Sequence, residues 1–272
     1  MTRQQPIGIF DSGIGGLTVA KAVADLLPEE QIVYFGDTAH MPYGDKSPDS
    51  IRYYCLRIAK FLLEQNCKMI VVACNTASSV GYRLLLDFFK SDRVLFVNVV
   101  DPLVDATVQM GFHKVGVIAT KATIQSRVYE IKLTEKQPEL EVASLATPLL
   151  APMIESGYFH DKISRTVLEN YLEAPELQNI EALLLACTHY PLIREDIQQL
   201  LGTQVRMLDS TDVTAAAVRK KLADRDLLNT ARTAPHHFFV SEFTQSFEET
   251  TRIFYGEDIH LEHCPIWTTD GR

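Results

Sequence analysis

Short apolar runs alternate with longer amphipathic stretches along most of the chain. The runs are rich in β-branched and aromatic residues, which is typical of buried strands. Strands are predicted at 6–10, 31–37, 68–75, 93–99, 114–120, 139–145, 181–187 and 204–210. Helices are expected at 15–28, 49–66, 77–90, about 121–136, 161–172 and 191–201, with a loop and short helix at 148–157 and no element assigned to 100–113. The alternation indicates parallel βαβ units, so we predict an α/β fold of doubly wound parallel sheets.

The two halves of this pattern resemble each other. The segments 69-MIVVACNTAS-78 and 182-ALLLACTHYP-191 align without a gap, and their cysteines are 113 residues apart (187 − 74). This spacing is too long for a solenoid repeat and suits two homologous domains related by a pseudo-two-fold axis. We expect one lobe to comprise 1–98 plus 211–272 and the other 99–210, with the active site between them.

The segment after residue 211 is assigned to the first lobe because the chain is expected to fold back on it. A helix at 211–223, a strand at 236–240, a helix at 244–255 and a strand at 258–263 are predicted there.

Composition and charge narrow the class of protein. The chain has 272 residues, 46% of them hydrophobic, and a net charge of −9, so it is a globular protein and a poor nucleic-acid binder. The start of the sequence does not read as a secretory signal, and the longest apolar runs are far too short to span a bilayer. A cytoplasmic protein without membrane or nucleic-acid partners is expected.

Five cysteines, at positions 55, 67, 74, 187 and 264, include no CxxC pair and no metal-binding spacing. We expect free thiols and no metal site. Cys55, Cys67 and Cys264 are interpreted as structural, since single buried cysteines are common. Cys74 and Cys187 end equivalent strands in the two halves, which favours a matched pair of catalytic thiols.

Polar residues accompany this pair at the carboxyl ends of strands, where α/β folds bind ligands. Helices that begin there would present free N–H groups, which favour an anion and lower the pKa of a thiol. Candidate residues at these strand ends and in the loops that follow are Asp11, Ser12, Tyr43, Gly44, Asn75, Thr76, Glu155, Thr188 and His189. The glycines at 13–16 do not match the dinucleotide fingerprint, because Thr18 occupies the third glycine position.

Six segments together resemble the glutamate racemase family. They are 9-IFDSGIGGLTV-19, 42-PYGDKS-47, 73-ACNTAS-78, 117-VIATKATIQS-126, 148-PLLAPMIESG-157 and 186-ACTHYPL-192. The resemblance implies an enzyme that interconverts L- and D-glutamate without pyridoxal phosphate or any other cofactor and supplies D-glutamate for peptidoglycan. It also implies acid/base roles for Cys74 and Cys187, and substrate contacts from Asp11, Ser12, Tyr43, Gly44, Asn75, Thr76, Thr188 and His189, with Thr120, Thr123 and Glu155 in the pocket. Ala119 and Ala186 depart from the family, which often has glycine there.

Racemisation removes a proton from one face of Cα and returns one to the other face. Two thiols from pseudo-symmetric lobes would do this without a large motion, with one as thiolate and one as thiol. Three alternatives stay open: a racemase of aspartate or another acidic amino acid, a non-catalytic amino-acid binder, and a cysteine hydrolase that uses Cys187 with His189. A homodimer is also left open.

Overall fold

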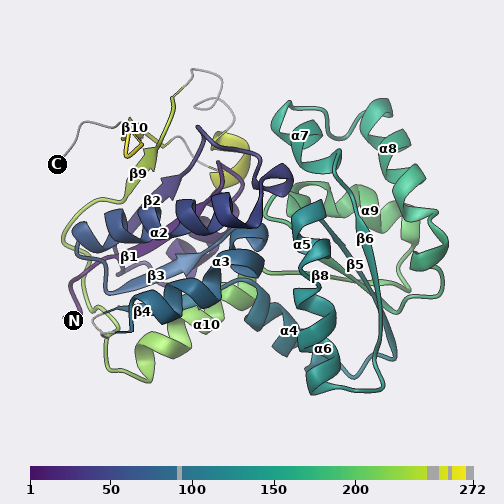
Figure 1. Ribbon diagram of the computed structural model, residues 1–272, viewed down its shortest axis with the longest axis horizontal. Helices are drawn as coiled ribbons and strands as arrows, with labels where there is room; N and C mark the ends of the chain where they lie inside the picture. The colour runs from purple at the N-terminus through teal and green to yellow at the C-terminus, as the bar shows by residue number, and fades with distance from the viewer. Residues whose placement is uncertain (91–93, 244–250, 257–258, 268–272) are drawn as a thin grey trace.

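Two parallel β-sheets, each covered by helices, lie side by side in the computed structural model (Figure 1). The structure describes residues 1–90, 94–243, 251–256 and 259–267. Every strand pair recorded for these residues is parallel. The predicted fold of doubly wound parallel sheets is confirmed.

The sheet of the first lobe contains six strands among the described residues, in the order β10-β9-β2-β1-β3-β4. The strands are β1 (Ile7–Asp11), β2 (Ile32–Gly36), β3 (Met69–Val72), β4 (Leu95–Asn98), β9 (His237–Val240) and β10 (Leu261–His263). β1, β2, β3 and β4 are buried throughout, because helices cover both faces of the sheet.

The sheet of the second lobe repeats the central order of the first. Its described strands are β5 (Lys114–Ala119), β6 (Glu141–Ala146), β7 (Ala182–Ala186) and β8 (Arg206–Asp209), in the order β6-β5-β7-β8. The first sheet has the corresponding order β2-β1-β3-β4 at its centre. The two halves therefore share one topology, in agreement with the alignment of their cysteine segments.

The helices pack against these sheets and connect their strands. The first lobe has α1 (Leu17–Leu26), η1 (Tyr43–Asp45), α2 (Pro48–Glu64) and α3 (Asn75–Phe88). The second has α5 (Lys121–Gln125), α6 (Val128–Lys136), α7 (Leu150–Glu155), α8 (Lys162–Leu172), η2 (Pro175–Leu177), η3 (Tyr190–Ile193) and α9 (Arg194–Leu201). α4 (Val100–Gln109) packs against α6 of the second lobe, α10 (Thr211–Ala223) packs against α1 of the first, and the two helices also contact each other.

Three sequence-based expectations need correction. The segment 100–113, left unassigned, contains α4, and Oδ1 of Asn98 accepts hydrogen bonds from the N–H groups of Val100 and Asp101 at its start, both at 2.8 Å. The single helix expected at 121–136 is two helices, because Arg127 adopts a left-handed conformation (φ 54°) between them. The helix expected at 191–201 begins as the 3₁₀ turn η3 before α9.

The chain after α10 returns to the first sheet. β9 pairs with β2 and β10 pairs with β9. Of the helix expected at 244–255, residues 244–250 lie outside the described residues and 251–255 are helical. Residues 93 and 258 of two expected strands also lie outside.

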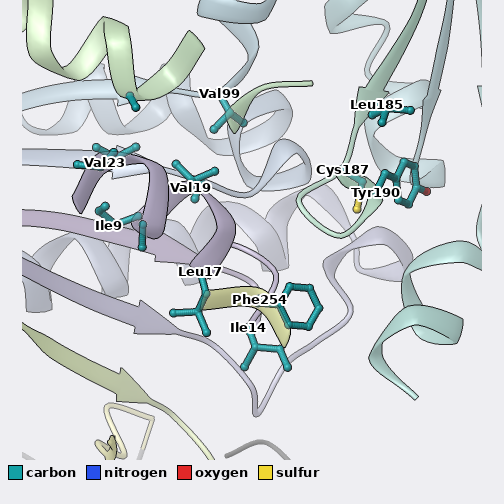
Figure 2. Close-up of a cluster of buried hydrophobic side chains, with 14 of the residues drawn as sticks. Ile9, Ile14, Leu17, Val19, Val23, Val99, Leu185, Cys187, Tyr190 and Phe254 are labelled. Atoms are coloured by element: carbon teal, nitrogen blue, oxygen red, sulfur yellow. The ribbon is translucent and has the colours of Figure 1, made fainter. Parts of the chain in front are cut away.

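The largest apolar cluster crosses from one lobe to the other. It joins Ile14 and Leu17 of the first lobe to Cys187 and Tyr190 of the second. Figure 2 shows Phe254 beside Ile14 and Leu17, with Cys187 and Tyr190 across from them. The lobes thus share a continuous core, which holds the strand ends of both sheets in one place.

Candidate active site

One small pocket lies where the two lobes meet, and it brings both candidate thiols together. Its cavity volume is about 20 Å³. The lining residues are Ser12, Pro42, Tyr43, Gly44, Cys74, Asn75, Thr76, Thr120, Ala151, Glu155, Cys187, Thr188 and His189. Cys74 follows β3 and Cys187 follows the equivalent strand β7.

Cys74 is the N-cap residue of α3. Its Sγ accepts a hydrogen bond from the N–H of Ala77 at 3.4 Å, and it lies 3.6 Å from the hydroxyl of Ser12. Burial, together with the nearby Asp11 carboxyl, nevertheless raises the pKa of Cys74 to about 12, because these effects outweigh the two hydrogen bonds. The helix N-terminus that the sequence predicted is present, but the expected fall in thiol pKa is not: Cys74 holds its proton.

Cys187 has a different environment. The chain forms a turn after it and continues as η3, so no long helix begins at this cysteine as it does at Cys74. Its Sγ lies 3.6 Å from Nδ1 of His189, while Nε2 of that ring lies 2.7 Å from Oε1 of Glu155. The N–H of Nε2 is not aligned on the Glu155 oxygen, so this contact is an ion pair and not a regular hydrogen bond.

The environment of His189 raises the pKa of its imidazole. Burial lowers the pKa of this imidazole, but the contacts with Cys187 and Glu155 raise it more, and the net result is a pKa well above its usual value. A buried imidazolium stabilises negative charge on the sulfur beside it. The two thiols therefore sit in unequal surroundings, because an imidazole of raised pKa lies beside Cys187 and none lies beside Cys74 among the described residues.

Asp11 lies behind this pocket and does not line it. It is fully buried; Oδ2 accepts from the N–H of Gly13 at 3.2 Å, and Oδ1 has no partner among the described residues. Burial raises its pKa, against the opposing effects of His189 and of the N–H groups of Gly16 and Gly13. Its effect on Cys74 is electrostatic.

Polar contacts across the lobes hold the start of α3. The hydroxyl of Thr76 lies 2.8 Å from that of Thr120 and 3.3 Å from that of Thr123. The Tyr129 hydroxyl of α6 donates to Oδ1 of Asn75 at 2.5 Å. Asn75 and Thr76 thus belong to the first lobe but are fixed by residues of the second.

All the predicted site residues except Asp11 and Thr123 line this pocket. Thr123 is buried behind Thr76 and Thr120. Sequence reasoning missed Pro42 and Ala151 as lining residues, although both lie in segments that carry the family resemblance. It also missed Tyr129, which no spacing rule connects with Asn75. Gly44 is required here because an added Cβ would come within 2.8 Å of Thr120 Cβ in the other lobe.

Within the described ranges, no group of three or more His, Cys, Asp or Glu side chains converges in a way that could hold a metal ion. None of the described helices has the length and apolar character needed to cross a bilayer. All five cysteines are free, as expected.

This fold and site define a class of protein, namely an α/β enzyme with a pocket between its lobes and two facing thiols. Residues 17–218 match the model of the Asp/Glu/Hydantoin racemase family. A glutamate racemase of Chlorobium phaeobacteroides is 40% identical over 262 residues, which is 95% of each chain. The structure of glutamate racemase from Francisella tularensis in complex with D-glutamate has a TM-score of 0.91 and 35% identity, covering 97% of this chain and 99% of that one.

An aspartate racemase from Picrophilus torridus has a TM-score of 0.55 at 22% identity, covers 80% of this chain and 94% of that one, and so shows a shared fold alone. The chain belongs to the Asp/Glu/hydantoin racemase family. It is accordingly an amino-acid racemase, an isomerase, and the family resemblance seen in the sequence is confirmed. The binder and hydrolase interpretations are set aside.

Proposed function

We propose that the chain interconverts L- and D-glutamate by proton transfer at Cα between Cys74 and Cys187, without pyridoxal phosphate. The observation that carries this proposal is that both thiols line one buried pocket, each from the equivalent strand end of its lobe. Two acid/base groups from different lobes give access to both faces of one carbon.

The unequal surroundings of the thiols support distinct roles in one direction of the reaction. Cys187, beside the His189 imidazolium, acts as the thiolate base and takes the Cα proton. Cys74, with a pKa of about 12, is the thiol that donates a proton to the opposite face. The step leaves Cys187 as a thiol and Cys74 as a thiolate, and the opposite enantiomer reacts by the reverse path.

The intermediate would carry negative charge next to the substrate carboxylate, and polar groups around the pocket can stabilise it. Nδ2 of Asn75 is buried without a partner in the described structure, and the hydroxyls of Ser12, Thr76 and Thr188 border the same space. In a buried site these donors act more strongly than in water.

Glutamate is proposed over aspartate because the more similar proteins are glutamate racemases, whereas the aspartate racemase shares only the fold. We also propose that the product D-glutamate supplies peptidoglycan synthesis. The cytoplasmic location and a homodimer stay predictions, as do the lobe boundaries at 98/99 and 210/211.

The decisive experiment incubates purified protein with L-glutamate in D₂O, without pyridoxal phosphate, and follows it by chiral chromatography and mass spectrometry. D-glutamate with one deuterium at Cα is expected.

Cys74→Ala and Cys187→Ala should each lower kcat by a factor on the order of 10³ or more, because both proton transfers are needed. Cys67→Ala, which removes a buried thiol outside the pocket, is the matched control and should retain turnover. Turnover near the wild-type level in either active-site variant would rule out the two-thiol scheme.

A further inference from the structure

The side-chain amide of Asn75 has one polar atom with a hydrogen-bond partner and one without among the described residues. Its side chain is 2% exposed. Oδ1 accepts the hydrogen bond from Tyr129, whereas Nδ2 is buried without a partner in the described residues, and Asn75 is one of the residues that line the pocket. An amide N–H that is buried without an acceptor is unfavourable, so this group is poised for a ligand acceptor.

Tyr129 decides which end of the amide faces the pocket. The phenol is 2% exposed, and Oδ1 of Asn75 is its one hydrogen-bond partner in the part of the chain that the structure describes. If the amide turned over, Nδ2 would donate to the phenol oxygen, and the phenol hydrogen would be buried without an acceptor. Burial also raises the pKa of Tyr129, so the hydroxyl remains a donor.

We infer that Tyr129 is a positioning residue that orients the Asn75 amide so that Nδ2 donates a hydrogen bond to a carboxylate oxygen of the substrate. This inference rests on the proposed function, since it names the group that meets the substrate carboxylate. The contact also crosses the lobes, from α6 to the first residue of α3. Tyr129 therefore makes substrate affinity depend on the second lobe without touching the substrate.

The test compares Tyr129→Phe with Tyr82→Phe in steady-state racemisation of both enantiomers. Tyr82 is the matched control because its hydroxyl donates to the carbonyl of Phe96 at 3.1 Å and lies outside the pocket. Tyr129→Phe should raise KM for L- and D-glutamate by about five- to tenfold, with a smaller change in kcat, as for a lost hydrogen bond. Tyr82→Phe should leave KM within about twofold.

Two further variants separate positioning from packing. In an Asn75→Ala background, Tyr129→Phe should add less than about twofold to KM, because the phenol acts through the amide. Asn75→Asp keeps an acceptor for Tyr129 but turns a negative oxygen toward the substrate carboxylate, so KM should rise more than tenfold in a folded protein.

Three results would overturn the inference: an unchanged KM in Tyr129→Phe, an equal effect of that change with and without Asn75, or wild-type affinity in Asn75→Asp. Wild-type protein that fails to racemise glutamate would instead contradict the proposed function. The two failures are therefore distinguishable.

Discussion

At the scale of single residues, the site differs from a symmetric pair of thiols. Cys74 has a hydroxyl and a backbone N–H beside it, whereas Cys187 has His189, which is paired with Glu155. Pseudo-symmetry of the fold places the sulfurs, but the two sulfurs have different polar neighbours. His189 is the residue that makes the pocket electrostatically unequal.

His189 predicts a pH dependence with a definite sign. Because its folded pKa is raised above the unfolded value of about 6.5, its charge stabilises the fold fully below that pH, and this contribution is lost as pH rises through the folded pKa. The stability difference between wild type and His189→Gln should shrink on the alkaline side of neutrality. Urea unfolding from pH 6 to 10 measures it, and a difference that grows with pH would contradict the prediction.

At the scale of elements, the loop from β2 to α2 depends on the end of the chain. Asp37 is fully buried, and it accepts hydrogen bonds from Tyr43 at 2.6 Å and from Ser241 and Trp267 at 2.8 Å each. Trp267 also packs edge-on against Tyr54, with ring centroids 5.4 Å apart. A pocket residue is thus held by a segment more than 200 positions away.

Trp267→Phe tests this dependence. The variant keeps an aromatic ring but loses the N–H that Asp37 accepts, which amounts to about 1 kcal/mol for a typical hydrogen bond. We expect KM for glutamate to rise by roughly two- to fivefold with kcat nearly unchanged. Tyr53→Phe, which alters an exposed ring beside Trp267, is the control and should keep the wild-type KM. A fall in kcat with constant KM would show that the tail does not act through substrate binding.

At the scale of the whole molecule, one buried ion pair ties distant segments to the first sheet. Nζ of Lys68 lies 2.6 Å from Oε2 of Glu30, and both side chains are almost fully buried. Lys68 also donates to the carbonyl of Leu227 at 2.9 Å, while Glu30 accepts from the N–H of Asn229 at 2.8 Å. The start of β3, the segment before β2 and the chain after α10 meet at this pair.

Removing only one partner of the Lys68–Glu30 pair should destabilise the fold. Lys68→Met leaves the Glu30 carboxylate buried without its cation, so the free energy of unfolding should fall by about 3–5 kcal/mol. The double change Lys68→Met with Glu30→Met should restore part of that loss. Lys60→Met breaks an exposed pair with Glu64 and should change stability by less than about 1 kcal/mol. Urea denaturation measures all three, and a small effect of Lys68→Met alone would disprove the role of the pair.

Much of the fold could be predicted from local patterns. Apolar runs marked the strands, and the repeated Ala-Cys segments marked two equivalent strand ends, because strand burial and strand-to-helix turns have short-range signals. The same signals missed α4 and the break at Arg127. A capping Asn98 and a left-handed residue affect the backbone without altering the apolar pattern.

The sequence by itself determined the fold class, the family and almost every pocket residue, since these depend on motifs within one strand and the turn after it. Only the tertiary structure decided which groups meet across the lobes. Tyr129 with Asn75, Trp267 with Asp37, Ser12 with Cys74 and Glu155 with His189 are contacts between distant segments. Burial and charge act over distances in space, so the raised pKa of Cys74 could be found only after the chain was folded.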